Sequence, residues 1–282
     1  RSDEAVAAIQ KGIKLLDAKT DEGLLERSFM LSNLAVVYQG VSKDPQALES
    51  LLKALADARA GENQPQVTRM LHNLGIVLMG QKDLDRAAAR LSEAMDSLGD
   101  DGSAATLFEI MEARADVENA RRNFPLAAFL YERCVALIEE MRRQGPPPEL
   151  ALKSGLALLA SGRIERAIPR LKSFLLSKPA PGSSEYFSAY FGLGTALANF
   201  QDYSGGIRHT VLARDGARLG GNPKAEHLAV ARLAEIQRAA GDRKAALAFA
   251  REAVDAASRL GLPELEEDRA RLRRLESDAA SR

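Results

Sequence analysis

Hydrophobic residues recur at helical spacing along most of the chain, and the stretch from Leu71 to Met95 shows the pattern most clearly. It reads LHNLGIVLMGQKDLDRAAARLSEAM, with one apolar helical face, a polar break around Gly80, and then a second apolar face. Small residues such as Gly75 and Ala87 would let two helices approach closely while leucines fill the space between them. This stretch therefore predicts an antiparallel pair of helices.

The same pattern returns at a nearly constant period. If Leu74 is taken as a marker, the equivalent positions are Leu34, Leu74, Arg114, Ser154, Leu193 and Leu233, which are 40, 40, 40, 39 and 40 residues apart. The residue thirteen positions after each marker is always small: Ala47, Ala87, Ala127, Ala167, Gly206 and Ala246. A helix pair with apolar surface on both sides cannot bury that surface alone, so a fixed period of this size predicts stacked repeats.

The predicted repeats account for almost all of the chain. Each repeat of such an array contacts only its neighbours, so we expect one elongated repeat domain over residues 1–282 rather than two globular domains. Residues 1–22 are expected to form an N-terminal edge helix, and residues 262–282 a capping helix with a polar outer side. The six repeats between them are predicted at 23–62, 63–102, 103–145, 146–182, 183–221 and 222–261.

The residues at fixed places in the first two repeats resemble the tetratricopeptide repeat family. They are Leu31, Leu34, Ala35, Tyr38, Ala47, Leu51 and Ala54, and then Leu71, Leu74, Gly75, Leu78, Ala87, Leu91 and Ala94. The period is longer than the usual 34 residues of this family and is similar to that of kinesin light chains and LGN-type adaptors. We therefore predict an all-α fold, a right-handed α-solenoid of stacked antiparallel helix hairpins.

The third repeat departs from this pattern, because Arg114 and Glu118 occupy the places of the marker leucine and the tyrosine. One interpretation is an ion pair between these two side chains, four residues apart, within the seam of the hairpin. The other is a rotated helix that turns Ile110, Ala113 and Val117 toward the core. Both sets of residues have helical spacing, so the sequence does not decide between the two interpretations.

Composition limits the classes of partner. The 39 basic and 39 acidic residues cancel, so no overall field attracts the chain to nucleic acid or to an anionic membrane. No apolar run approaches the roughly 20 residues that a membrane-spanning helix needs. We expect a cytoplasmic protein that binds neither nucleic acid nor membrane, and Arg1 in place of methionine suggests a piece of a longer one. The oligomeric state is not predicted.

Candidate catalytic and metal-binding residues are few. His72, His209 and His227 lie in three different repeats, and Cys134, at a small-residue position of the third repeat, is expected to be packed and unreactive. No pair of these residues has the spacing of a helical metal site. We therefore expect a protein that is not an enzyme and that uses no cofactor and no metal.

Two asparagines are the first candidates for binding a partner. Asn33 and Asn73 directly precede the marker leucines, on the first helix of each hairpin, which lines the concave side of a stacked array. An asparagine amide both donates and accepts, so it can bind the backbone of an extended peptide. The resemblance implies the same role, because long-repeat adaptors clamp ligand backbones with asparagines at this place. The alternative is that both side chains cap local backbone or bridge neighbouring repeats.

The corresponding positions further along are Ala113, Lys153, Gly192 and Arg232, so the asparagine ladder stops after two repeats. The residues one helical turn from these positions predict the chemistry of the groove. It would be partly basic at one end, acidic at the third repeat, and aromatic in the later repeats. The alternative is that these charges are solvated helix faces. The predicted peptide-binding residues are Asn33, Asn73, Arg69, His72, Glu112, Asp116, Lys153, Phe191 and Arg232.

These observations favour a protein–protein interaction scaffold that binds an extended peptide or short helix of a partner protein in the concave groove. The alternative is a regulatory sensor domain of a larger signalling or transcription-regulating protein, which changes curvature when it binds a small ligand or a peptide.

Overall fold

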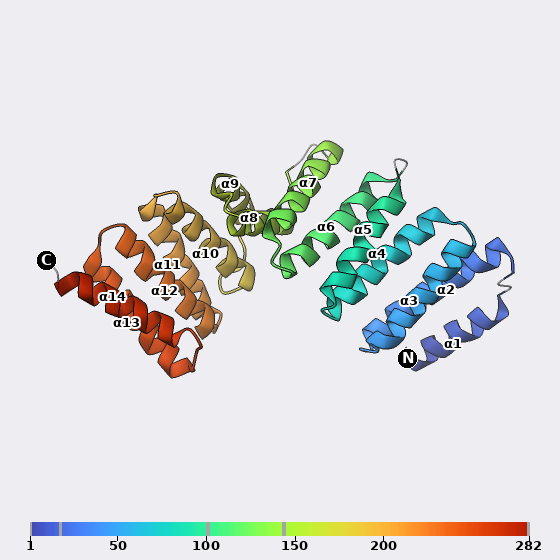
Figure 1. The fold of residues 1–282 in the computed structure, drawn as a ribbon, viewed down its shortest axis with the longest axis horizontal. Coiled ribbons are helices and arrows are strands. Elements are labelled where there is room, and N and C mark those ends of the chain that lie inside the picture. Colours follow the sequence, from blue (N-terminus) through green and yellow to red (C-terminus); the bar gives the residue numbers. More distant parts are fainter. Residues whose placement is uncertain (1, 17–18, 100–101, 143–144, 281–282) are drawn as a thin grey trace. The chain divides into compact units, whose positions relative to one another are not determined.

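The computed structural model describes residues 2–16, 19–99, 102–142 and 145–280, and within these residues it contains fourteen α-helices and no strand (Figure 1). The predicted all-α class is confirmed. The chain divides into two compact units, Arg1–Gln144 and Gly145–Arg282, which we describe separately. The expectation of one domain over residues 1–282 stays a prediction, and parts of its edge segments, 1–22 and 262–282, lie outside the described residues.

The helices of each unit follow one another with short turns. Unit 1 contains α1 (Ser2–Leu15), α2 (Asp21–Gly40), α3 (Asp44–Ala60), α4 (Gln64–Gly80), α5 (Leu84–Leu98), α6 (Ala104–Ala120) and α7 (Phe124–Arg142). Unit 2 contains α8 (Pro148–Ala160), α9 (Ile164–Leu175), α10 (Ser184–Asn199), α11 (Tyr203–Leu219), α12 (Pro223–Ala239), α13 (Arg243–Leu260) and α14 (Leu265–Ala280). None of the described helices is long and apolar enough to span a membrane.

Consecutive helices pack in pairs, and the pairs stack. In unit 1 the hairpins are α2 with α3, α4 with α5, and α6 with α7; in unit 2 they are α8 with α9, α10 with α11, and α12 with α13. The first helices of neighbouring hairpins also contact one another, α2 with α4 and α4 with α6, and likewise α8 with α10 and α10 with α12. Each unit is therefore a stack of helix hairpins, as the period of the sequence predicts.

The turn inside every hairpin has the same backbone geometry. One residue just after the first helix has a positive φ angle, and it is Ser42, Lys82, Arg122, Gly162, Gln201 or Gly241 in the six hairpins. The next residue donates its N–H back to the end of the helix, for example from Asp83 N to Leu78 O at 3.0 Å. This is the hydrogen-bond pattern of a Schellman motif, in which a left-handed residue ends the helix. The repeat is thus present in the backbone as well as in the side chains.

Small residues set how closely the two helices of a hairpin approach. Ala47, Ala87 and Ala127 are fully buried at the predicted contact positions. A Cβ atom added to Gly75 would lie 2.5 Å from Leu91 Cγ, which is closer than real side chains allow. Any larger residue at position 75 would displace the Leu91 side chain or push α4 and α5 apart, because protein cores have no spare volume at such contacts.

The structure shows the local geometry at two places that the sequence left open. The sequence interpretations of α6 are not exclusive, because Arg114 Nε donates to Glu118 Oε1 at 3.0 Å while Ile110 and Val117 are also fully buried. The first helix of the first hairpin, α2, begins at Asp21. Thr20 is its N-cap, and the side chain of Thr20 accepts a hydrogen bond from the backbone of Gly23 at 3.0 Å.

Candidate partner-binding surfaces

The first helices of unit 1 carry exposed and half-buried side chains at equivalent positions on one face. Phe29, Asn33 and Val36 are four and three residues apart, so they point to the same side of α2, opposite the buried Leu31 and Leu34. The equivalent residues of α4 and α6 continue this side, and the three helices lie side by side (Figure 1). We call it the unit 1 face, formed by Glu26, Phe29, Asn33, Val36, Arg69, His72, Asn73, Ile76, Glu109, Glu112 and Asp116.

Two large apolar side chains are exposed on α2 within this face. Phe29 is 39% exposed and Val36 is 61% exposed, and the exposed Asn33 lies between them. Phe29 and Val36 are not among the binding residues predicted from the sequence. Their position in the repeat could have identified them, because they are equivalent to Arg69 and Ile76 of the next hairpin. Arg69 is one of the predicted binding residues.

The side chains of α4 bridge to α2. The guanidinium of Arg69 lies 5.3 Å from the centre of the Phe29 ring, in cation–π geometry. Asn73 Nδ2 donates to Ser32 Oγ at 3.3 Å. Asn73 thus bridges neighbouring repeats, which was the alternative to a role in peptide binding. This contact uses only one of the hydrogen bonds that an asparagine amide can form. Asn33 makes no such bond within the described residues and is open to a partner.

His72 is half-buried between α4 and α6, and burial lowers its pKa below the ordinary value of 6.5, while the nearby charge of Glu109 opposes this shift. A histidine with a lowered pKa is neutral at pH 7. His72 therefore adds no positive charge to the face at that pH.

The α6 edge of the face is acidic. Glu109 is exposed, and Glu112 is half-buried one turn further along. Asp116 accepts a hydrogen bond of 2.5 Å from the hydroxyl group of Tyr131 on α7. Burial, and then the charge of Asp116, raise the pKa of Tyr131, so this hydroxyl stays a donor to the carboxylate. Asp116 is consequently oriented by the core, whereas Glu109 extends toward solvent.

The remaining predicted residues lie in unit 2. Lys153 Nζ is 3.6 Å from Glu149 Oε1, one turn earlier on α8. Phe191 is half-buried and stacks on Phe187, with ring centres 5.3 Å apart. Phe200 is 55% exposed, because it is the residue that ends α10 rather than one within the helix.

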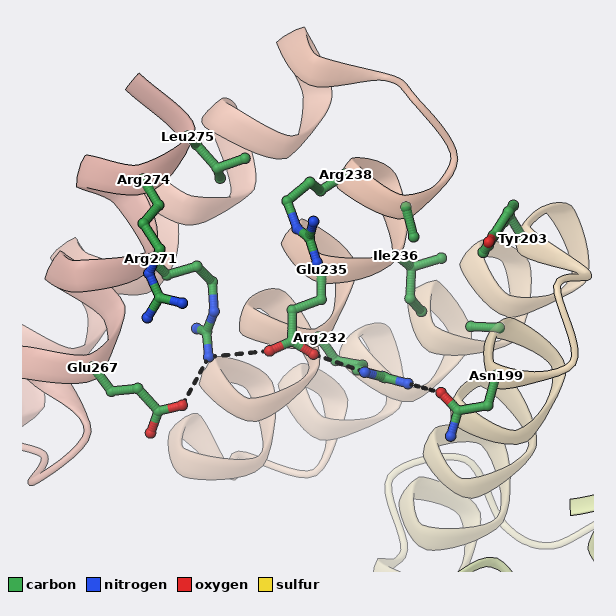
Figure 2. Close-up of a pocket in the computed structure, with 12 residues that line it drawn as sticks. Asn199, Tyr203, Arg232, Glu235, Ile236, Arg238, Glu267, Arg271, Arg274 and Leu275 are labelled. Carbon is green, nitrogen blue, oxygen red and sulfur yellow. Dashed lines mark hydrogen bonds and ion pairs between the residues drawn. The ribbon is translucent and has the colours of Figure 1, made fainter. Parts of the chain in front are cut away.

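A pocket of about 390 Å³ lies among α10, α12 and α14, and Arg232 is part of its wall (Figure 2). Arg232 Nη2 donates to Asn199 Oδ1 at 2.8 Å, and Arg232 Nη1 to Glu235 Oε2 at 2.7 Å. Arg271 lies 3.2 Å from both Glu235 and Glu267, so a chain of polar contacts joins the three helices. Arg232 therefore ties neighbouring hairpins together.

The same network holds the last helix in place. Asp268 is buried on α14, and its carboxylate oxygens lie 2.7 Å from His227 Nε2 and 2.6 Å from Arg271 Nη1. The expected capping helix is thus anchored through a buried acid, in addition to its apolar side at Leu275. The sequence alone does not predict this anchor, because a run of alternating charges is equally typical of a solvated surface.

The structure thus brings together Asn33, Arg69, His72, Asn73, Glu112 and Asp116 on the unit 1 face, and places Lys153, Phe191 and Arg232 on the first helices of unit 2. Their role in binding a peptide stays a prediction.

Comparison with known proteins supports the fold. Residues 26–100 match the tetratricopeptide repeat family. Among solved structures, the putative kinesin light chain repeats of Podosopora anserina are similar, with a TM-score of 0.55 and 16% identity over 68% of this chain and 95% of that one. YrrB, a tetratricopeptide repeat protein described as having an unusual peptide-binding site, is also similar. Its TM-score is 0.53 and its sequence identity 17%, over 71% of this chain and 93% of that one.

A third similar structure is larger than this chain. It is a signal transduction ATPase with numerous domains and a tetratricopeptide repeat sensor, from Pyrococcus horikoshii. Its TM-score is 0.63 and its identity 17%, over 91% of this chain and 40% of that one. No curated protein matched the sequence. These likenesses establish the fold, a tetratricopeptide-type solenoid.

Proposed function

From a chain built of tetratricopeptide-type hairpins, with kinesin-light-chain-like repeats, we propose a non-catalytic protein–protein interaction scaffold. The unit 1 face holds an extended segment or a short helix of a partner protein. The proposed partner is a protein rather than a nucleic acid, because the 39 basic and 39 acidic residues cancel and leave no overall field that would attract a phosphate backbone.

The observation that carries the proposal is the exposed stripe Phe29–Asn33–Val36 on α2. Leaving two large apolar side chains in water forgoes the free energy that their burial would give. Such residues mark a surface that gains this energy when a partner covers it. Between them, the Asn33 amide can donate to and accept from the backbone of an extended segment whatever its side chains are.

A pull-down with the whole chain as bait identifies partners, and the affinity of a purified partner then tests the site. Replacing both amides, Asn33→Ala with Asn73→Ala, removes hydrogen bonds worth about 1 kcal/mol each, so we expect affinity to fall roughly 5- to 100-fold. Gln46→Ala, an exposed amide on the second helix of the same hairpin, is the matched control and leaves affinity unchanged. Equal affinities for the double variant and the wild type would refute the backbone clamp.

A regulatory sensor is the second candidate function. The stacking of helix hairpins favours it, because a stack of hairpins can change its curvature when a ligand binds. The likeness to the sensor-containing protein of Pyrococcus horikoshii is in keeping with this candidate. Small-angle scattering tests it: a bound peptide or small ligand changes the radius of gyration of a sensor, and an unchanged radius argues for the scaffold.

A further inference from the structure

The pocket of about 390 Å³ among α10, α12 and α14 is lined by more positive than negative charge (Figure 2). Four of its lining residues are arginines and two are glutamates: Arg232, Arg238, Arg271 and Arg274, and Glu235 and Glu267. The whole chain is neutral, with 39 basic and 39 acidic residues, so this excess is a local feature. All three helices belong to unit 2, so the pocket lies within one compact body.

Helical spacing places these charges on two facing sides of the pocket. The three charged residues of α12 follow one another at three-residue intervals, and the three of α14 at intervals of four and three. Residues three or four apart lie on the same face of a helix, so each set forms one face. The two faces meet across the pocket, where Arg271 Nη2 lies 3.2 Å from Glu235 Oε1.

Two of the four arginines already have partners. Arg232 donates to Asn199 and Glu235. Arg271 is shared by both glutamates of the pocket and by the buried Asp268. These contacts use the carboxylates of the wall and still leave a donor over, because Arg232 Nε is buried and has no hydrogen-bond partner within the described residues.

Arg238 and Arg274 are the other two arginines, and neither contacts a carboxylate in the part of the chain that the structure describes. Both are exposed, and their side chains extend from α12 and α14 toward the contact between Glu235 and Arg271 (Figure 2). A cleft lined by one sign of charge concentrates ions of the opposite sign. We propose that this pocket binds a small molecule through a phosphomonoester group, which Arg238 and Arg274 contact from two sides.

Charge and shape select a phosphomonoester among the possible anions. Such a group carries about 1.5 to 2 negative charges at pH 7 and three acceptor oxygens, which suits two guanidinium groups that have no other carboxylate. A carboxylate or a sulfate ester carries only one charge. The planar fork of donors on arginine also binds phosphate oxygens in pairs.

The rest of the wall suits a small organic ligand. Pockets for small molecules enclose about 300–1,000 Å³, and this one lies at the lower end of that range. The buried Ile236 and Leu275 supply apolar surface, and Asn199 and Tyr203 supply neutral polar groups. No residue of the unit 1 face takes part, so this proposal does not rest on the scaffold function.

Phenyl phosphate is a suitable probe, because it joins a phosphomonoester to a small apolar ring. Nuclear magnetic resonance follows its titration into the isotope-labelled whole chain, in about 150 mM salt to screen unspecific attraction. We expect the amide signals of α12 and α14 around the pocket to shift, with a dissociation constant on the order of 1 mM. Phenyl sulfate has a similar shape and less charge, so it should bind about 5-fold more weakly or worse.

Arg238→Gln with Arg274→Gln should weaken the binding of phenyl phosphate about 10-fold or more, because hydrogen bonds from charged donors are lost. Arg259→Gln with Arg273→Gln is the matched control. It removes the same charge from exposed positions of α13 and α14 outside the pocket, so it should bind like the wild type. Thermal unfolding without ligand should show no loss of stability for the pocket variant, since its two arginines have no carboxylate partner among the described residues.

Several results would overturn the proposal. One is the absence of any shift at about ten times the expected dissociation constant. Another is equal affinity of the pocket variant and the wild type, or an equal loss of affinity in the control variant, which would indicate attraction to overall charge. Phenyl sulfate bound as tightly as phenyl phosphate would show that the pocket does not select a phosphomonoester. A less stable pocket variant would show that the two arginines hold the fold instead.

Discussion

Arg114→Leu tests whether the ion pair of α6 is a structural substitute for the apolar pair of the other repeats. Glu118 is fully buried and accepts hydrogen bonds from Arg114 Nε at 3.0 Å, from Arg121 Nη1 at 2.9 Å and from Asn123 Nδ2 at 2.8 Å. Removing Arg114 leaves the buried carboxylate without its mostly buried partner, whereas Arg121 is partly exposed and Asn123 is uncharged.

Breaking a buried ion pair costs about 3–5 kcal/mol when one charge is left behind. Two donors to Glu118 remain, so we expect Arg114→Leu to lower the free energy of unfolding by about 2–4 kcal/mol. Adding Glu118→Leu restores the two leucines, Leu74 and Leu78, that the second repeat has at these places. The buried charge is then gone, and the double variant should unfold within about 1 kcal/mol of the wild type.

Hydrogen exchange with mass spectrometry measures this locally, because repeats open in nearly independent segments. Peptides from α6 and α7 should exchange faster in Arg114→Leu and at close to the wild-type rate in the double variant. Peptides from unit 2 serve as the internal reference. The reasoning is wrong if the single variant exchanges like the wild type, or if the double variant is as unstable as the single one.

Three further predictions concern unfolding by urea. Gly194→Ala should lower the free energy of unfolding by about 1–3 kcal/mol, because the added Cβ would lie 2.9 Å from Thr210 N in the facing helix. Gly80→Ala is the control and should not lower it, because a Cβ atom added to Gly80 would have no other atom within 4 Å. Lys82→Gly should stabilise by about 0.5–1 kcal/mol, since Lys82 has a φ of 61° that glycine adopts freely; equal or lower stability would contradict this. Burial lowers the pKa of His72 below 6.5, so the unfolded chain takes up its proton at a higher pH than the folded one. Stability should therefore be full above pH 6.5 and fall below it, and His72→Gln should reduce this fall; an unchanged pH profile would be evidence against it.

Much of the fold follows from the sequence because the period of about 40 residues predicts stacked helix hairpins. A small residue thirteen places after each marker is enough to predict helix pairs, and those positions are buried as expected. The orientation of α6 did not follow, since Arg114 and Ile110 lie on two stripes with the same helical spacing. The hydrogen bond from Arg114 to Ser92 on α5 shows how α6 can bury the Arg114 stripe and the Ile110 stripe together.

The candidate site followed only in part from the sequence. Asn33 was found because it has a fixed place beside the marker leucine. Phe29 and Val36 were missed because a hydrophobic residue on an amphipathic helix is expected in the core, and only packing shows that it is exposed. The anchoring of α14 through Asp268 depends on His227, 41 residues away, and no local pattern predicts a contact at that separation.

The most direct test of the central claim is hydroxyl-radical footprinting of the whole chain with and without a bound partner segment. Phe29 and Leu52 are 39% and 40% exposed on the first and second helix of one hairpin, so both should be labelled in the free protein. We predict that the partner protects Phe29 and Val36 from labelling and leaves Leu52, and Phe129 on α7, unprotected. Protection of Leu52 or Phe129 with continued labelling of Phe29 would place the partner on the opposite side and contradict the account.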